Sequence, residues 1–133
     1  VASDLNLPEE SYRYFQKASR IDLGNELLNS GHGLHAASLG GLWQAAIYGF
    51  AGIRMKDQIL YVNPRLPEAW SELSFKLQLG ETLLGVLVTQ GEVTISVVEA
   101  GQAVQVQIVD EQFTLDKKRV AARIPLPRVG ENV

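Results

Sequence analysis

The chain has 133 residues, of which 46% are hydrophobic and 20% are charged, and twelve basic against fifteen acidic residues give a formal net charge of −3. This length suits one modest domain, or a small domain with a piece of another, so a complete two-domain enzyme and a globally disordered chain are excluded. The absence of cysteine excludes disulfides, thiol nucleophiles and Cys-ligated zinc, and the absence of a basic stripe with interleaved aromatic residues argues against a nucleic-acid partner.

Residues 8–19 are predicted to form an amphipathic helix. Pro8 followed by two acidic residues is typical of a helix N-terminus, where carboxylates favour the positive end of the helix dipole. Tyr12, Phe15 and Ala18 recur at helical spacing and define one narrow apolar face. The residues expected to point away from that face are polar: Arg13, Gln16, Lys17 and Arg20.

A second helix is predicted from Ser38 to about residue 50, and it is apolar on nearly every side. Such a helix is normally buried on several sides. Its aromatic residues Trp43, Tyr48 and Phe50 are expected to pack in a core rather than to form a platform for a sugar. Two helices cannot close a core by themselves, so we expect the helical part to belong to something larger.

The longest apolar stretch, residues 40–53, is interrupted by Gln44 and four glycines, and it is shorter than the ~20 residues of a membrane span. No membrane association is therefore expected. Residues 1–3 read Val-Ala-Ser without a methionine or a signal-like leader, so we interpret the chain as an excised piece of a longer protein rather than a processed product. We expect that protein to be cytoplasmic.

From residue 53 to residue 115 the apolar pattern changes to a period of two, which is typical of strands with one solvated face. Turn signals at residues 79–81, 90–91 and 100–101 space these strands about ten residues apart, as in an antiparallel sandwich or barrel. The apolar positions are Leu73, Phe75, Leu77, Leu79, Val93, Ile95, Val97, Val104, Val106 and Ile108.

Two shorter strands are predicted near residues 53–56 and 59–62, on either side of a turn at Asp57-Gln58. Together with the longer strands they indicate a sandwich of five or six strands, which could stand alone. The basic, proline-containing end of the chain is predicted to form an edge strand and a loose tail. The predicted parts are therefore helical residues 1–52, sandwich residues 53–115 and tail residues 116–133.

The two histidines, His32 and His35, lie close to Ser38 in a glycine-rich segment. Ser38 is a natural N-cap for the apolar helix, which would place His35 and Ser38 where free backbone N–H groups and the helix dipole bind anions. This pattern favours a phosphate or carboxylate ligand, which the backbone of nearby glycines could approach closely. The alternative is that Ser38 only caps, the glycines only allow tight packing and the histidines hydrogen-bond within a loop.

Other chemistry is less favoured by these residues. His32 and His35, even with Asp22 and Glu26 upstream, do not form the three-ligand set of a catalytic zinc, so no metal is expected. No nucleophile elbow, Walker loop or complete dinucleotide-binding motif occurs, which excludes serine hydrolases and nucleotide-binding enzymes. Trp70 follows a proline-bounded turn, and we interpret it as a packing plug, with stacking on a ligand as the alternative.

Three segments together resemble the C-terminal end of glycoside hydrolase family 65, the maltose, trehalose and kojibiose phosphorylases. They are residues 33–45 (GLHAASLGGLWQA), 49–54 (GFAGIR) and 63–75 (NPRLPEAWSELSF), and the resemblance extends over residues 8–115. In that family a β-sandwich follows an (α/α)6 barrel that carries the active site. The resemblance therefore implies an α+β chain in which terminal helices of an (α/α)6 barrel precede an antiparallel β-sandwich.

The inverting phosphorylases of this family protonate the glycosidic oxygen with one carboxylic acid and use inorganic phosphate as the nucleophile. The family's H-x-x-S-x-G-G run lies in its phosphate pocket and maps onto His35 and Ser38. The resemblance thus implies phosphate binding by His35, Ser38, Leu39 and Gly40, with His32 as a candidate sugar-binding residue. It implies no cofactor, only inorganic phosphate as co-substrate.

Two departures from the family pattern affect this interpretation. The family's glutamate near the glycine-apolar-histidine step is missing from Ser30-Gly31-His32, which leaves the acceptor sugar open. The general acid belongs to earlier parts of the barrel, so no catalytic residue is expected in this chain.

The expected function is a C-terminal fragment of an α-glucoside (disaccharide) phosphorylase, inactive alone, whose parent binds a disaccharide and phosphate and is a candidate homodimer. The alternatives are a hydrolase of the same family and a non-catalytic sugar-binding or scaffolding sandwich.

Overall fold

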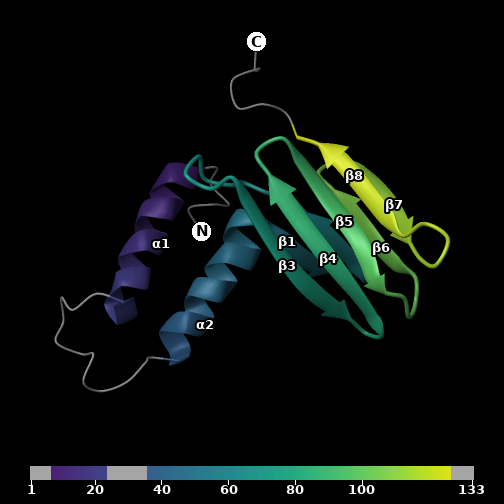
Figure 1. Ribbon diagram of the computed structural model, residues 1–133, viewed down its shortest axis with the longest axis horizontal. Helices are drawn as coiled ribbons and strands as arrows, with labels where there is room; N and C mark the ends of the chain where they lie inside the picture. Colours follow the sequence, from purple (N-terminus) through teal and green to yellow (C-terminus); the bar gives the residue numbers. More distant parts are fainter. Residues whose placement is uncertain (1–6, 24–35, 127–133) are drawn as a thin grey trace, which may run out of the picture.

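The computed structural model describes residues 7–23 and 36–126 of the chain. Two helices lie beside a β-sandwich, which confirms the predicted α+β class (Figure 1). The helices are α1 (Pro8–Leu23), α2 (Ala36–Gln44) and a π-helix, η3 (Ala45–Phe50), that continues α2 directly. None of the helices in this part of the chain has the length and hydropathy to cross a bilayer.

The sandwich consists of two four-stranded sheets. One sheet has the order β1-β2-β6-β7, with β1 (Ile53–Lys56), β2 (Ile59–Val62), β6 (Val104–Ile108) and β7 (Glu111–Leu115). The other has the order β3-β4-β5-β8, with β3 (Glu72–Leu79), β4 (Thr82–Thr89), β5 (Glu92–Glu99) and β8 (Ala121–Pro125).

All neighbouring strands are antiparallel except β2 and β6, which are parallel. A parallel pair needs a long crossover connection, and here the connection carries β3, β4 and β5 of the opposite sheet. The antiparallel sandwich predicted from the sequence therefore contains one parallel pair. It also has more strands than the predicted five or six, because β4 and β7 were not recognised.

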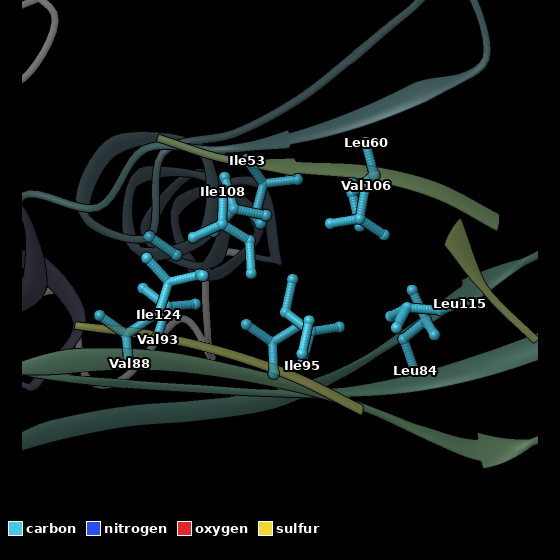
Figure 2. Packing of buried hydrophobic residues seen from close by; sticks show 14 of the residues in the cluster. Ile53, Leu60, Leu84, Val88, Val93, Ile95, Val106, Ile108, Leu115 and Ile124 are labelled. Atoms are coloured by element: carbon cyan, nitrogen blue, oxygen red, sulfur yellow. The ribbon is translucent and has the colours of Figure 1, made fainter. Parts of the chain in front are cut away.

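The core lies between the two sheets, where side chains from both inner faces meet (Figure 2). Leu60, Val106 and Ile108 approach from one sheet, and Leu84 and Ile95 approach from the other, all of them fully buried. Every inward position predicted from the period of two is buried or half-buried. The alternation of apolar and polar residues therefore fixes which face of each strand enters the core.

Helix α1 presents the predicted apolar face to the rest of the chain. Tyr12, Phe15 and Ala18 are half-buried, and the four polar residues predicted to point away are exposed. The helix begins at Pro8 as expected but ends at Leu23, later than the predicted residue 19.

A tight corner joins η3 to β1 at Gly52. Gly52 adopts a left-handed φ of 65°, and its carbonyl accepts a hydrogen bond from the Asn63 N–H at 3.2 Å. A Cβ atom on Gly52 would lie 1.9 Å from the Asn63 carbonyl oxygen. Only glycine fits here, because both the backbone conformation and the close approach exclude a side chain.

The turns that close the sandwich follow from local chemistry. Asp57 and Gln58 both have positive φ, 51° and 62°, as a two-residue hairpin of type I′ requires, so the turn predicted between β1 and β2 is confirmed. In the loop between β7 and β8, Asp116 Oδ1 accepts hydrogen bonds from the N–H groups of Lys118 at 2.7 Å and Arg119 at 2.8 Å. The Arg119 and Lys118 amides lower the pKa of the Asp116 carboxyl.

Across the surface of the second sheet, Arg123 Nε donates to Glu92 Oε2 at 2.7 Å. This hydrogen bond raises the pKa of the Arg123 guanidinium. Because both side chains reach solvent, the pair adds little to stability and serves to align β8 with β5.

Replacing Gly52 by alanine is expected to destabilise the chain by at least ~2 kcal/mol, because a left-handed φ alone costs ~1–2 kcal/mol for an alanine and the Asn63 carbonyl must also move. The matched control is Gly91→Ala, since no heavy atom of residues 7–23 and 36–126 lies within 4 Å of a Cβ built on Gly91. Denaturant unfolding followed by circular dichroism measures both changes. Equal stabilities of the two variants would contradict this account of the corner.

Replacing Asp116 by alanine is expected to lower the melting temperature at pH 7 by a few degrees at most, because two loop amides lose their acceptor. A carboxyl with a lowered folded-state pKa stabilises above its unfolded pKa, and this contribution is lost as the pH falls through the folded pKa. The difference from the parent chain should therefore shrink as the pH falls below the usual pKa range of an aspartate carboxyl. Thermal melts across pH test this, with Asp110→Ala as a control that lacks such amide partners. A difference that persists in acid would contradict it.

Candidate functional site

Three of the predicted site residues lie at the beginning of α2. Helix α2 starts at Ala36, so Ser38 is its third residue and the prediction that Ser38 caps the helix is wrong. The two alanines before Ser38 have the highest helix propensity and extend the helix upstream. The backbone N–H of Ser38 still belongs to the first turn, where N–H groups have no partner within the helix. His32 and His35 lie outside the described residues.

The start of α2 is open within the described part of the chain. Ser38 is half-buried and Leu39 is 42% exposed. No heavy atom of the described chain lies within 4 Å of a Cβ built on Gly40 or Gly41. Residues 7–23 and 36–126 contain no group of three His, Asp or Glu side chains placed to hold a metal ion. The first turn of α2 therefore offers polar backbone groups and the Ser38 hydroxyl.

The apolar surface of α2 is not buried, contrary to the prediction. No residue of α2 is buried, Trp43 is 51% exposed, and Tyr48 in η3 is 45% exposed. Their rings pack on each other edge to face, with centroids 6.1 Å apart, and only Phe50 enters the core as predicted. The sequence identified the apolar residues correctly, but the described chain covers α2 only on the side of α1 (Figure 1).

The helices are joined to the sandwich by four aromatic side chains, Tyr12, Phe15, Phe50 and Trp70, which we call the aromatic junction. Trp70 lies at the centre, with ring centroids 6.1 Å from Tyr12, 5.4 Å from Phe15 and 5.0 Å from Phe50. All three contacts are edge to face, the geometry that aromatic quadrupoles favour. The interpretation of Trp70 as a packing plug is confirmed.

Hydrogen bonds hold the loop that carries Trp70. The Gln90 side-chain amide, in the turn between β4 and β5, donates to the carbonyl oxygens of Pro67 at 2.9 Å and Trp70 at 2.8 Å. On the other side, the Glu68 N–H donates to Glu9 Oε1 of α1 at 3.3 Å. The loop therefore connects α1 to the sheet through its backbone as well as through the Trp70 ring.

Helix α2 and η3 together form a rod of residues 36–50, which we call the α2–η3 rod, and hydrogen bonds fix its C-terminal end. Directly after η3, the Ala51 N–H donates to the carbonyl of Ala46, five residues earlier, at 2.9 Å. Arg54 Nη1 donates to the Tyr48 carbonyl at 2.6 Å and to the Ile53 carbonyl at 2.8 Å. The guanidinium thus satisfies the Tyr48 carbonyl near the helix C-terminus, where positive charge is favoured, and the Ile53 carbonyl at the start of β1.

Sequence reasoning missed both the π-helix and the role of Arg54. An apolar run containing Gly49 has no pattern that separates a π-helix from an α-helix. The carbonyl groups that Arg54 reaches are evident only once Arg54 is placed in β1. The result is a rod anchored in the sandwich at its C-terminal end, with the first-turn N–H groups of α2 at its other end. Such an end attracts an anion.

Comparison with known proteins gives consistent results. Residues 53–115 match the family model "Glycosyl hydrolase family 65, C-terminal domain". A kojibiose phosphorylase of Halothermothrix orenii is 51% identical over 53% of this chain and 9% of its own length. An α,α-trehalose phosphorylase of Thermoanaerobacter brockii is 31% identical over 90% of this chain and 15% of its own length.

A solved structure titled "Putative kojibiose phosphorylase from human microbiome" matches 99% of this chain with a TM-score of 0.83 and 26% sequence identity. The match covers 19% of that chain. The chain therefore spans less than a fifth of the length of the relatives it resembles. The order of helices followed by sandwich is shared with this longer phosphorylase structure.

Replacing Trp70 by alanine is expected to cost about 2–4 kcal/mol, because a half-buried indole with three ring contacts is removed from the aromatic junction. The matched control is Trp43→Ala, which removes an indole that is 51% exposed and should cost less than about 1 kcal/mol. Urea unfolding measures both, and Trp70→Phe should recover part of the loss. A Trp43→Ala variant as unstable as Trp70→Ala would contradict this assignment.

Proposed function

The chain belongs to glycosyl hydrolase family 65, as a C-terminal portion. On this premise we propose that its parent is an inverting α-glucoside phosphorylase. Residues 1–52 then contribute the last helices of an (α/α)6 barrel, residues 53–115 the C-terminal sandwich, and residues 116–133 an edge strand and tail. The chain alone has no turnover, because the general acid lies upstream. That the parent is a homodimer stays a prediction.

The observation that carries this proposal is the exposed apolar surface of the α2–η3 rod. Leu39, Trp43 and Tyr48 are each 42–51% exposed on one short segment. An apolar patch of this kind marks a surface that another part of the protein covers. Neighbouring barrel helices of the parent are the proposed cover, which agrees with the small share of its relatives that the chain spans.

In the proposed reaction, one phosphate oxygen attacks the anomeric carbon from the face opposite the glycosidic bond. The carbon–oxygen bond to the acceptor breaks, the acceptor oxygen takes the proton of the upstream acid, and the new bond gives a β-glucose 1-phosphate. The first-turn N–H groups of α2 and the Ser38 hydroxyl donate hydrogen bonds to the other phosphate oxygens. The His35 imidazole adds a further donor, and the backbone at Leu39 and Gly40 forms the wall of the pocket.

The relatives are named as phosphorylases of different glucosides, so the disaccharide is not assigned. The Halothermothrix protein is a kojibiose phosphorylase, whereas the Thermoanaerobacter protein is a trehalose phosphorylase. Their shared chemistry is transfer of a glucosyl unit to phosphate. The proposal for this chain is therefore limited to an α-glucoside and inorganic phosphate.

Replacing Ser38 by alanine in the parent enzyme is expected to raise the KM for phosphate by about tenfold to a hundredfold, since a hydrogen bond to a charged group contributes ~1.5–3 kcal/mol. The KM for the disaccharide should change little. Steady-state phosphorolysis at varied phosphate concentration measures both constants. Ser19→Ala on α1, which also removes the hydroxyl of a half-buried serine, is the matched control and should leave them unchanged.

Two outcomes would overturn the proposal. One is glucose release by the parent at the same rate with and without phosphate, which would identify a hydrolase. The other is an unchanged KM for phosphate in both Ser38→Ala and His35→Ala.

A further inference from the structure

The sandwich contains a hollow of about 530 Å³ at the end of β1 that is remote from η3. Two turns line its sides, the one between β1 and β2 and the one between β3 and β4. The remaining wall comes from residues just before and within β6 and from β7. In Figure 1 the β3–β4 turn lies at the end of the sandwich away from α1. The hollow is therefore separate from the start of α2 and from the aromatic junction.

Four glutamines line this hollow: Gln58, Gln102, Gln105 and Gln112. Gln105 accepts a hydrogen bond from Thr114 Oγ1 at 3.1 Å. The side-chain amides of the other three make no hydrogen bond to any residue in the described part of the chain. Each amide offers two donors and an acceptor, so the hollow presents unused groups of both kinds.

The charge of the hollow indicates a neutral ligand. Asp57 is its single ionisable lining residue, although one residue in five of the whole chain is charged. Met55 also lines the hollow and is 54% exposed, so its side chain adds an apolar surface. The amide groups can hydrogen-bond to hydroxyls, and the apolar patch can pack against C–H groups. Both features suit a neutral polyhydroxylated molecule.

The backbone at Gln102 is held by hydrogen bonds within the chain. Thr82 Oγ1, which is buried, donates to the Gln102 carbonyl at 2.6 Å and accepts from the Gly101 N–H at 3.2 Å. Gly80 has a left-handed φ of 58°, and a Cβ there would lie 2.7 Å from Gln102 Nε2. The amide of Gln102 thus lies against Gly80, in the space that a side chain at this position would fill.

We propose that this hollow is a secondary carbohydrate site that binds a neutral α-glucoside through Gln58, Gln102 and Gln112, with Met55 against the sugar ring. The choice of an α-glucoside rests on the proposed function, whereas the preference for a neutral sugar rests on the residues of the hollow. The volume is within the range of small-molecule pockets and accommodates a disaccharide.

The experiment is an NMR titration of the full 133-residue chain with kojibiose and maltose. We expect the side-chain NH₂ signals of the three glutamines to shift, with a Kd of about 1–10 mM, typical of an open site with few contacts. Gln112→Ala removes an exposed amide with no partner in the described chain and should weaken binding about fivefold or more. Gln16→Ala, an exposed glutamine on α1, is the matched control and should leave the Kd unchanged.

Inorganic phosphate and glucose 1-phosphate serve as charged probes and should not shift the glutamine signals. The proposal is overturned if no glucoside shifts them up to about 50 mM, if the shifts occur at Trp43 or Trp70 instead, or if Gln16→Ala weakens binding as much as Gln112→Ala. In the parent enzyme, Gln112→Ala should leave kcat and the KM for phosphate unchanged. The two proposals can therefore fail separately: Gln112→Ala tests the secondary site, and Ser38→Ala tests the phosphate site.

Discussion

The edge-to-face packing of Trp70 against three other rings is the contact on which the relation between helices and sandwich depends. Tyr12 and Phe15 come from α1, Phe50 from the end of η3, and Trp70 from the loop before β3. One indole in the loop before β3 therefore contacts two segments that are distant from it in the sequence, α1 and η3. Because the same loop is hydrogen-bonded to Gln90 and Glu9, the helices and the second sheet share one set of constraints.

This arrangement also relates the sandwich to the proposed phosphate site. The α2–η3 rod is attached at its C-terminal end, by the corner at Gly52 and by Arg54, to the first strand of the sandwich. Its other end is the proposed anion site. A rigid body that holds one end of a helix determines the direction of the N–H groups at the other end. The sandwich therefore positions the proposed phosphate site.

Much of the fold could be predicted from local pattern. The period of two and the Asp57-Gln58 turn gave the hairpins, and the spacing of Tyr12 and Phe15 gave the buried face of α1. Strand β4 was missed because Leu83 and Leu87 are half-buried on its outer face, which removes the alternation. Burial of α2 was predicted wrongly, because hydropathy shows that a residue favours burial and not which segment covers it.

The candidate sites were less predictable than the fold. The glutamines of the hollow come from separate turns and strands, and glutamine has no spacing rule that would identify them as a group. Ser38 was identified, but its role as a cap depended on the helix boundary, which is the least certain part of a pattern.

The parallel pairing of β2 with β6 has a consequence for the order in which the molecule forms. The β1–β2 hairpin, which carries the rod, has no second neighbour until three strands of the other sheet have been made and the chain has returned. Such a long closure is slow relative to local hairpins. A nascent or truncated polypeptide that stops before β6 therefore holds its helices on an incomplete sandwich. The proposed anion site at the start of α2 reaches its final orientation only when the last strands have formed.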